Sequence, residues 1–178
     1  CCKSATNWYK YFFHIKFYYK EKEICNDIAY IIFTSGSTGE PKGVPISYEN
    51  LENFINWISN IKPLDSYSNI SVLNQASFSF DLSVADLYYS LCNGHTLVAL
   101  EGNILTDYSK IYDIFFKDSI NVAVMTPSLM KLCLLNKEFN ERNYPNFKCV
   151  YFCGERLEVK IASKLLEAFP SLNVINAY

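Results

Sequence analysis

The chain has 178 residues, of which 50% are hydrophobic and 19% charged. This composition excludes intrinsic disorder, which requires low hydrophobicity and high net charge. The length suits one core or one lobe of a larger domain. A formal charge of -2 offers no basic field for a nucleic-acid backbone, and no run of about 18 apolar residues is present to span a membrane. We therefore expect neither a nucleic-acid partner nor a membrane span.

Cysteine usage points away from disulfides and structural metals. The seven cysteines are odd in number, form no CxxC pair and are accompanied by only two histidines, His14 and His95. A zinc site would need a different ligand spacing, and scattered thiols are typical of a reducing cytosol. We expect free thiols, no metal site on this chain and a cytoplasmic location.

Residues 1–24 differ from the rest of the chain. They are rich in Tyr, Phe and Lys and show no helical or strand period. The lysines interrupt every apolar run before a signal-peptide core can form. We expect an irregular segment here, at the edge of a fragment, and a folded domain at 25–178.

From residue 28 onward, apolar runs alternate with helical patterns. Strands are expected at 28–33, 71–74, 96–100, 122–125, 149–152 and 173–176, the first of them buried. Helices are expected after the capping residue Ser47, at 81–93 before Gly94, at 109–117, from Pro127, and at 159–169. Strands joined by helices favour an α/β fold with a mostly parallel sheet and helices on both faces.

Three polar loops follow expected strands, at 34–43, 75–81 and 153–155. Ligands of parallel sheets bind outside the carboxyl ends of the strands. The chemistry is therefore expected where these loops converge.

The first of these loops is rich in glycine and hydroxyl groups. It reads Thr34-Ser35-Gly36-Ser37-Thr38-Gly39-Glu40-Pro41-Lys42-Gly43. Backbone N–H groups, hydroxyl donors and the Lys42 cation together suit a phosphate chain. The spacing is not that of a Walker A loop, because Pro41 stands where the second glycine belongs. The competing interpretation is a flexible surface loop.

The segment YIIFTSGSTGEPKGV resembles the phosphate-binding signature of the adenylate-forming superfamily. That superfamily includes acyl-CoA synthetases, firefly luciferase and the adenylation domains of peptide synthetases. The resemblance implies part of a large N-terminal domain that uses ATP to convert a carboxylate into an acyl-adenylate before transfer to a thiol. It also implies that Thr34, Ser35, Gly36, Ser37, Thr38, Gly39 and Lys42 bind ATP.

Asp81 is the candidate that would select the carboxylate substrate. It follows Phe78 and Phe80 at the start of an expected helix, where an Asp often serves only as an N-cap. The alternative is a carboxylate that pairs with a substrate ammonium while the two rings exclude water. Phe80-Asp81-Leu82-Ser83 is similar to the pattern of the amino-acid-activating branch, which favours the second interpretation.

Three further segments narrow the resemblance: LNQASFSFDLSVADLYYSLCNGHTLVAL, TPSLM and YFCGERL. They are similar to the branch that loads D-alanine onto a D-alanyl carrier protein bearing a phosphopantetheine arm, for the decoration of cell-wall teichoic acids. The resemblance covers about 26–178. It implies that Cys153 lines the alanine pocket, whereas a plain buried thiol is the competing interpretation.

Asn176, Ala177 and Tyr178 resemble the opening of the superfamily's adenine-binding segment. The resemblance implies that the Mg²⁺ ligand and the catalytic Lys lie outside these residues. We therefore assign no catalytic residue and expect this polypeptide alone not to turn over. Two alternatives stay open: a peptide-synthetase-type adenylation domain for another amino acid, and a non-catalytic nucleotide-binding fragment.

Overall fold

A five-stranded parallel sheet forms the centre of the computed structural model, which describes residues 27–34, 41–100 and 109–178. The strand order is β4-β3-β5-β6-β7. The bounds are β3 (Ser71–Asn74), β4 (Thr96–Ala99), β5 (Val122–Met125), β6 (Cys149–Phe152) and β7 (Asn173–Asn176). The expected strands are confirmed, with β4 one residue shorter than expected.

Two of the helix ends that the sequence marked carry the expected cap, the start of α1 and the end of α2. The helix bounds are α1 (Tyr48–Ser59), η1 (Leu64–Ser66), α2 (Leu82–Asn93), α3 (Ser109–Lys117), α4 (Pro127–Cys133) and α5 (Val159–Ala168). Before α1, Ser47 Oγ accepts a hydrogen bond from the Asn50 N–H (3.2 Å), and the Asn50 side chain accepts one from the Ser47 N–H. After α2, Gly94 has a left-handed φ of 70°, as expected of a helix-ending glycine.

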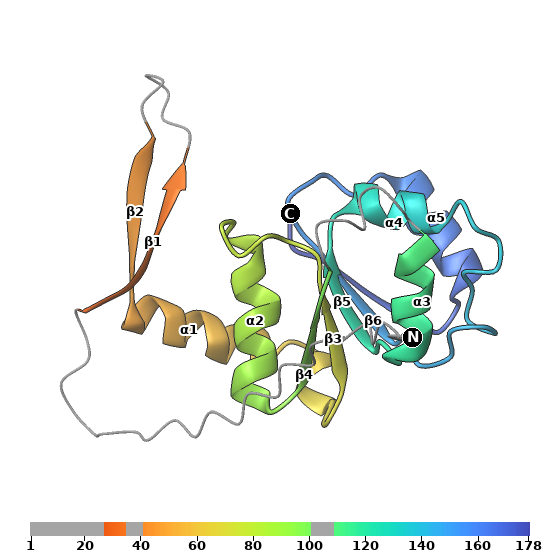
Figure 1. The fold of residues 1–178 in the computed structure, drawn as a ribbon, viewed down its shortest axis with the longest axis horizontal. Coiled ribbons are helices and arrows are strands. Elements are labelled where there is room, and N and C mark those ends of the chain that lie inside the picture. The colour runs from red at the N-terminus through yellow and green to blue at the C-terminus, as the bar shows by residue number, and fades with distance from the viewer. Residues whose placement is uncertain (1–26, 35–40, 101–108) are drawn as a thin grey trace, which may run out of the picture.

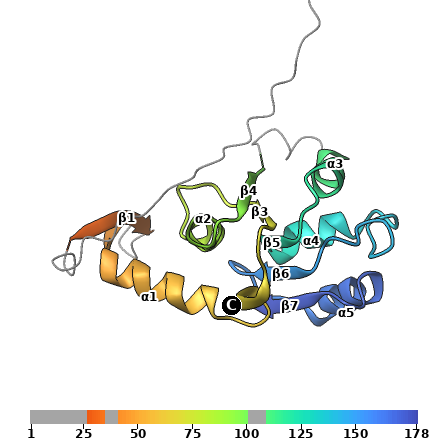
Figure 2. The same cartoon turned by 90° about the horizontal axis from the view of Figure 1, so that it is seen from below.

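Each face of the sheet buries its own apolar core, because successive side chains of a strand point to opposite faces. Helices α1 and α2 lie on one side and α3, α4 and α5 on the other (Figures 1 and 2). One core contains the strand residues Val72, Val122, Val124, Cys149 and Tyr151. The other contains Leu73, Ala123, Met125, Val150 and Phe152. This arrangement confirms the α/β class with helices on both faces.

The strand expected at 28–33 is present, but the prediction that it is buried is wrong. β1 (Ile28–Thr34) pairs antiparallel with β2 (Lys42–Ser47), which the sequence did not predict, and this hairpin is separate from the central sheet (Figure 1). Ile31 is 51% and Phe33 69% exposed, so β1 is not buried. An apolar run alone does not distinguish a central strand from one arm of a hairpin.

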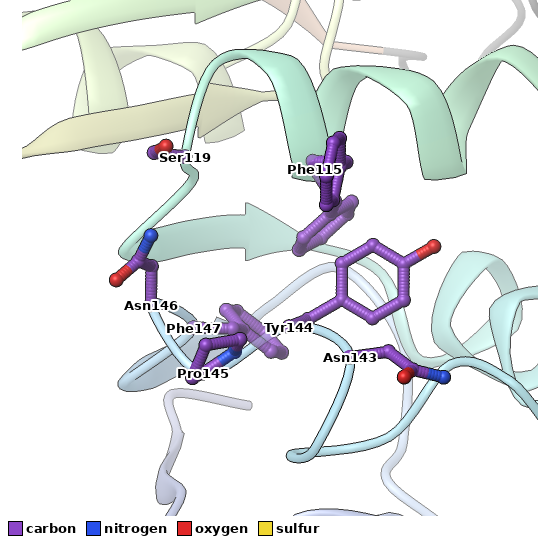
Figure 3. Close-up of a pocket in the computed structure, with 8 residues that line it drawn as sticks. Phe115, Ser119, Asn143, Tyr144, Pro145, Asn146 and Phe147 are labelled. Atoms are coloured by element: carbon purple, nitrogen blue, oxygen red, sulfur yellow. The ribbon is translucent and has the colours of Figure 1, made fainter.

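A cavity of about 250 Å³ lies near the amino ends of β5 and β6. Figure 3 shows Phe115 of α3 above it and Tyr144 and Phe147 of the segment before β6 below it. Ligands of parallel sheets bind at the opposite, carboxyl edge. Within the described ranges, no helix combines the length and the apolar character needed to cross a bilayer.

Candidate functional site

The carboxyl ends of four strands form one continuous edge. The ladder pairs Asn74 with Val124, Met125 with Phe152, and Phe152 with Asn176. Because the strands are parallel, the segments that follow them leave the sheet on the same side. The sheet thus brings together the segments after β3, β5, β6 and β7.

Hydrogen bonds hold these segments against one another. Gln75 Oε1 accepts from the backbone N–H of Thr126 at 2.7 Å, which joins the exit of β3 to the start of α4. The Cys153 N–H donates to the Met125 carbonyl at 3.4 Å, and the Ala177 N–H donates to the Phe152 carbonyl at 2.9 Å. Of the three loops expected to converge, those at 75–81 and 153–155 are consistent with this edge. The loop at 34–43 was also expected here, but the strand before it, β1, belongs to a separate two-stranded sheet.

Gly154 brings the Cys153 turn close to the first residue of α2. Its φ of 83° lies in the left-handed region. A Cβ added there would stand 3.7 Å from Thr126 Cγ2 and 3.8 Å from Leu82 Cδ2. Leu82 directly follows Asp81, and Leu82 and Cys153 pack against the same core. Asp81 and Cys153, the two candidates for substrate binding, therefore lie on neighbouring segments of the structure.

Asp81 does not cap α2. Its backbone has helical angles (φ -60°, ψ -28°) and its side chain makes no capping hydrogen bond. A capping side chain requires an extended backbone at that position, so the interpretation as a side-chain N-cap is wrong. The carboxylate belongs to an exposed residue at the start of the helix.

The expected shielding of Asp81 by aromatic rings is also wrong. Phe78 and Phe80 are 58% and 65% exposed, and neither ring belongs to either core. The hairpin lies close enough to Asp81 to feel its charge. Burial is the largest cause that raises the pKa of the Tyr30 hydroxyl in β1, and the charges of Tyr88 and Asp81 follow as smaller causes.

The glycine-rich segment begins at the last residue of β1 and runs into β2 along the chain. Thr34 pairs with Lys42 at the ends of the two strands, so Lys42 is a strand residue rather than a loop residue. Ser35, Gly36, Ser37, Thr38 and Gly39 lie outside the described residues.

The last three residues are the end of β7 and the two residues that follow it. Asn176 ends the strand and is exposed. Ala177 packs against the core that contains Cys149, and Tyr178 is 73% exposed. The predicted adenine-binding residues thus lie at the carboxyl end of β7.

Glu155 is a site contact that the sequence did not single out. Its carboxylate accepts hydrogen bonds from the backbone N–H of Ser128 (3.2 Å) and from the Ser128 hydroxyl. The bond ties the segment after β6 to the first turn of α4. The signal available in the sequence was its position two residues after Cys153, in the polar loop that follows an expected strand.

Among the described cysteines, Cys133 and Cys149 are buried, whereas Cys92 is exposed. Burial raises the pKa of the Cys133 and Cys149 thiols to about 12 in each case, which keeps them protonated and unreactive. Cys92, Cys133, Cys149 and Cys153 are all free. Among the described residues, no group of three or more His, Cys, Asp or Glu side chains could hold a metal ion.

Comparison with known proteins agrees with the geometry. A D-alanine--D-alanyl carrier protein ligase from Listeria monocytogenes is 47% identical over 161 residues, covering 89% of this chain and 31% of that protein. The ligase of that name from Lactococcus lactis is 44% identical over 153 residues, covering 86% and 30% respectively. This chain therefore spans about 30% of the length of these curated relatives.

Two solved structures share the fold. The Vibrio cholerae adenylation domain AlmE, in complex with glycyl-adenosine-5'-phosphate, superposes with a TM-score of 0.72 at 31% identity, over 84% of this chain and 27% of that one. The N-terminal domain of FACL13 from Mycobacterium tuberculosis gives a TM-score of 0.74 at 20% identity, over 88% and 38%.

The family assignment rests on most of the sequence. Residues 10–178 match the model of the AMP-binding enzyme family. The parallel sheet, its helices on both faces and the polar segments at its carboxyl edge agree with that match. This chain belongs to the AMP-binding enzyme family.

Proposed function

We propose that this chain is part of an ATP-dependent ligase that activates D-alanine and transfers it to a D-alanyl carrier protein. Relatives that carry this name match most of the chain at 44% and 47% identity. A relative bound to glycyl-adenosine-5'-phosphate supports a small amino acid as the substrate class. The single observation that carries the proposal is the free Asp81 carboxylate at the start of α2, next to Leu82, the residue that Gly154 faces.

The proposed reaction has two steps. A carboxylate oxygen of D-alanine attacks the α-phosphorus of ATP, and pyrophosphate leaves with the electron pair of the broken P–O bond. The phosphopantetheine thiolate of the carrier protein then attacks the carbonyl carbon, and AMP leaves. The thiol proton passes to solvent.

Each predicted residue has one role in this scheme. Thr34, Ser35, Gly36, Ser37, Thr38, Gly39 and Lys42 hold the polyphosphate, and Asn176, Ala177 and Tyr178 hold the adenine. Asp81 pairs with the α-ammonium group, a charge-assisted contact that gains strength when water is excluded. Cys153 forms one wall of the methyl pocket. Because one methyl group contributes only about 1–3 kcal/mol to selection, such a pocket must reject larger side chains sterically.

Mg²⁺ would neutralise the polyphosphate charge in such a ligase. The described residues offer no cluster of acidic ligands for it, so we expect its ligands elsewhere in the complete protein. We also propose a cytoplasmic location, because the activation step requires ATP. The resemblance to the D-alanine-loading branch further supports a place in the D-alanylation of cell-wall teichoic acids.

A substrate panel in amino-acid-dependent ATP–pyrophosphate exchange tests the proposal, using the complete product of the gene that encodes this chain. We expect the largest exchange rate with D-alanine. A preference for glycine, L-alanine or a large amino acid would assign the protein to another amino-acid adenylation class. No exchange with any amino acid would indicate a non-catalytic nucleotide-binding protein. We expect the 178 residues by themselves to show no exchange.

A further inference from the structure

Asp86 is a fully buried acidic residue that the proposed reaction does not use. It lies in the second turn of α2 with none of its surface exposed. Its Oδ2 accepts a hydrogen bond from Asn74 Nδ2 at 2.8 Å, whereas its Oδ1 has no partner. A buried carboxyl group with half of its hydrogen-bonding capacity unused is costly, which suggests a role beyond packing.

Asn74 connects this carboxyl group to the segment that carries Asp81. Asn74 is the last residue of β3 and is 3% exposed. Its Nδ2 donates to Asp86 and also to the backbone carbonyl of Ala76 at 3.0 Å. Both hydrogens of one amide are therefore used, one on the helix and one on the loop.

The bridge fixes both ends of the loop 75–81. At its start, Asn74 holds the Ala76 carbonyl. At its end, the Val84 N–H donates to the Asp81 carbonyl at 3.0 Å, so Asp81 moves with the first turn of α2. Asp86 follows in the same helix, and its bond to Asn74 sets where that helix begins relative to β3.

We infer that Asp86, acting through Asn74, is a positioning residue that holds Asp81 where it meets the substrate ammonium. The inference rests on the proposed function, because it assigns Asp81 a ligand. Charge-assisted contacts depend steeply on distance and direction. A loop held only by its chain ends would place the carboxylate less accurately.

The experiment measures the KM for D-alanine and the KM for ATP in pyrophosphate exchange, with the complete product of the gene. We expect Asp86→Ala and Asn74→Ala to raise the KM for D-alanine by about tenfold and to leave the KM for ATP unchanged. Asp86→Asn retains an oxygen that can accept from Asn74, so it should restore the KM for D-alanine to near its wild-type value.

Ser90→Ala is the matched control. Ser90 is buried in α2 one turn beyond Asp86, and its hydroxyl has no partner. It makes no bond to Asn74, so neither KM should change.

The outcomes separate the inference from the proposed function. Unchanged KM values in folded Asp86→Ala, parallel changes in both KM values, or no rescue by Asp86→Asn would each overturn the positioning role alone. If Asp86→Ala does not fold, Asn74→Ala decides, and if neither folds the pair is a structural requirement and the inference fails. A wild-type protein without D-alanine-dependent exchange would overturn the proposed function, and the inference with it.

Discussion

Gly154 faces Leu82 across two segments 72 residues apart: a Cβ added at Gly154 would stand 3.8 Å from Leu82 Cδ2. The turn that carries Cys153 therefore lies beside the helix that begins after Asp81. The distance from the added Cβ is ordinary, so space alone does not require glycine there. The requirement comes from the backbone, whose φ is 83°.

Gly154→Ala should therefore destabilise the fold by about 1–2 kcal/mol, the cost of a left-handed residue with a Cβ. It should also raise the KM for D-alanine on the order of tenfold, because relief of the strain moves the neighbouring Cys153. Urea denaturation and pyrophosphate exchange measure the two effects.

Gly94→Ala is the control for this substitution. Gly94 has a φ of 70° and nothing within 4 Å of an added Cβ, at the far end of α2. It should lose similar stability without changing the KM for D-alanine. Equal changes of KM in the two variants would show that the Gly154 effect is only a general loss of stability.

Asp81→Ala should abolish D-alanine binding and leave ATP binding intact. Because the Asp81 side chain makes no capping bond, the free energy of unfolding should change by less than about 0.5 kcal/mol. Calorimetric titration with each ligand and a urea melt check both statements. Ser47→Ala provides the contrast: it removes a side chain that does cap a helix, and should cost about 1 kcal/mol. Loss of ATP and D-alanine binding together would contradict the role of Asp81.

Local signals predicted most of the central sheet. The apolar runs at Val122–Met125 and Cys149–Phe152 coincide with β5 and β6, because strands covered on both faces are continuously apolar. Gly94 marked the end of α2 for a purely local reason, the left-handed backbone that ends a helix.

The hairpin could not be predicted in the same way. β2 contains Gly43 and Pro45, residues that weaken a strand pattern, and it forms because β1 offers an antiparallel partner. The exposure of Phe78 and Phe80 likewise depends on what covers the loop. Motif spacing identified Asp81 and Cys153 as candidates, but the Asn74–Asp86 bridge and the Glu155–Ser128 bond join segments 12 and 27 residues apart.

The Glu155–Ser128 bond should be energetically coupled. A double-mutant cycle with Glu155→Ala and Ser128→Ala should give a coupling free energy of about 1 kcal/mol, typical of a partly screened bond to a charged group. The cycle is measured by urea denaturation. As a comparison, Lys117 and Asp113 form an ion pair on α3 whose side chains are 63% and 64% exposed, for which about 0.3–0.5 kcal/mol is expected. A coupling at Glu155 no larger than at this surface pair would mean that the bond does not fix the turn.

Asp86 should make stability depend on pH. Burial raises the pKa of its carboxyl group from 3.8 to about 7, and the hydrogen bond from Asn74 only partly offsets this. Between these two values the folded protein binds a proton that the unfolded chain has released. Stability should therefore fall as pH rises through this window, by on the order of 4 kcal/mol at most.

The comparison that isolates this effect is wild type against Asp86→Asn in urea melts at pH 5 and pH 8. His95 acts in the opposite direction, since burial lowers its pKa and its protonation below about pH 6.5 costs stability. Because both proteins contain His95, its contribution cancels in the difference. The advantage of Asp86→Asn over wild type should grow from pH 5 to pH 8. A difference that is the same at both values would mean that Asp86 titrates alike in the folded and unfolded states, and that its buried carboxyl group carries no stored electrostatic cost.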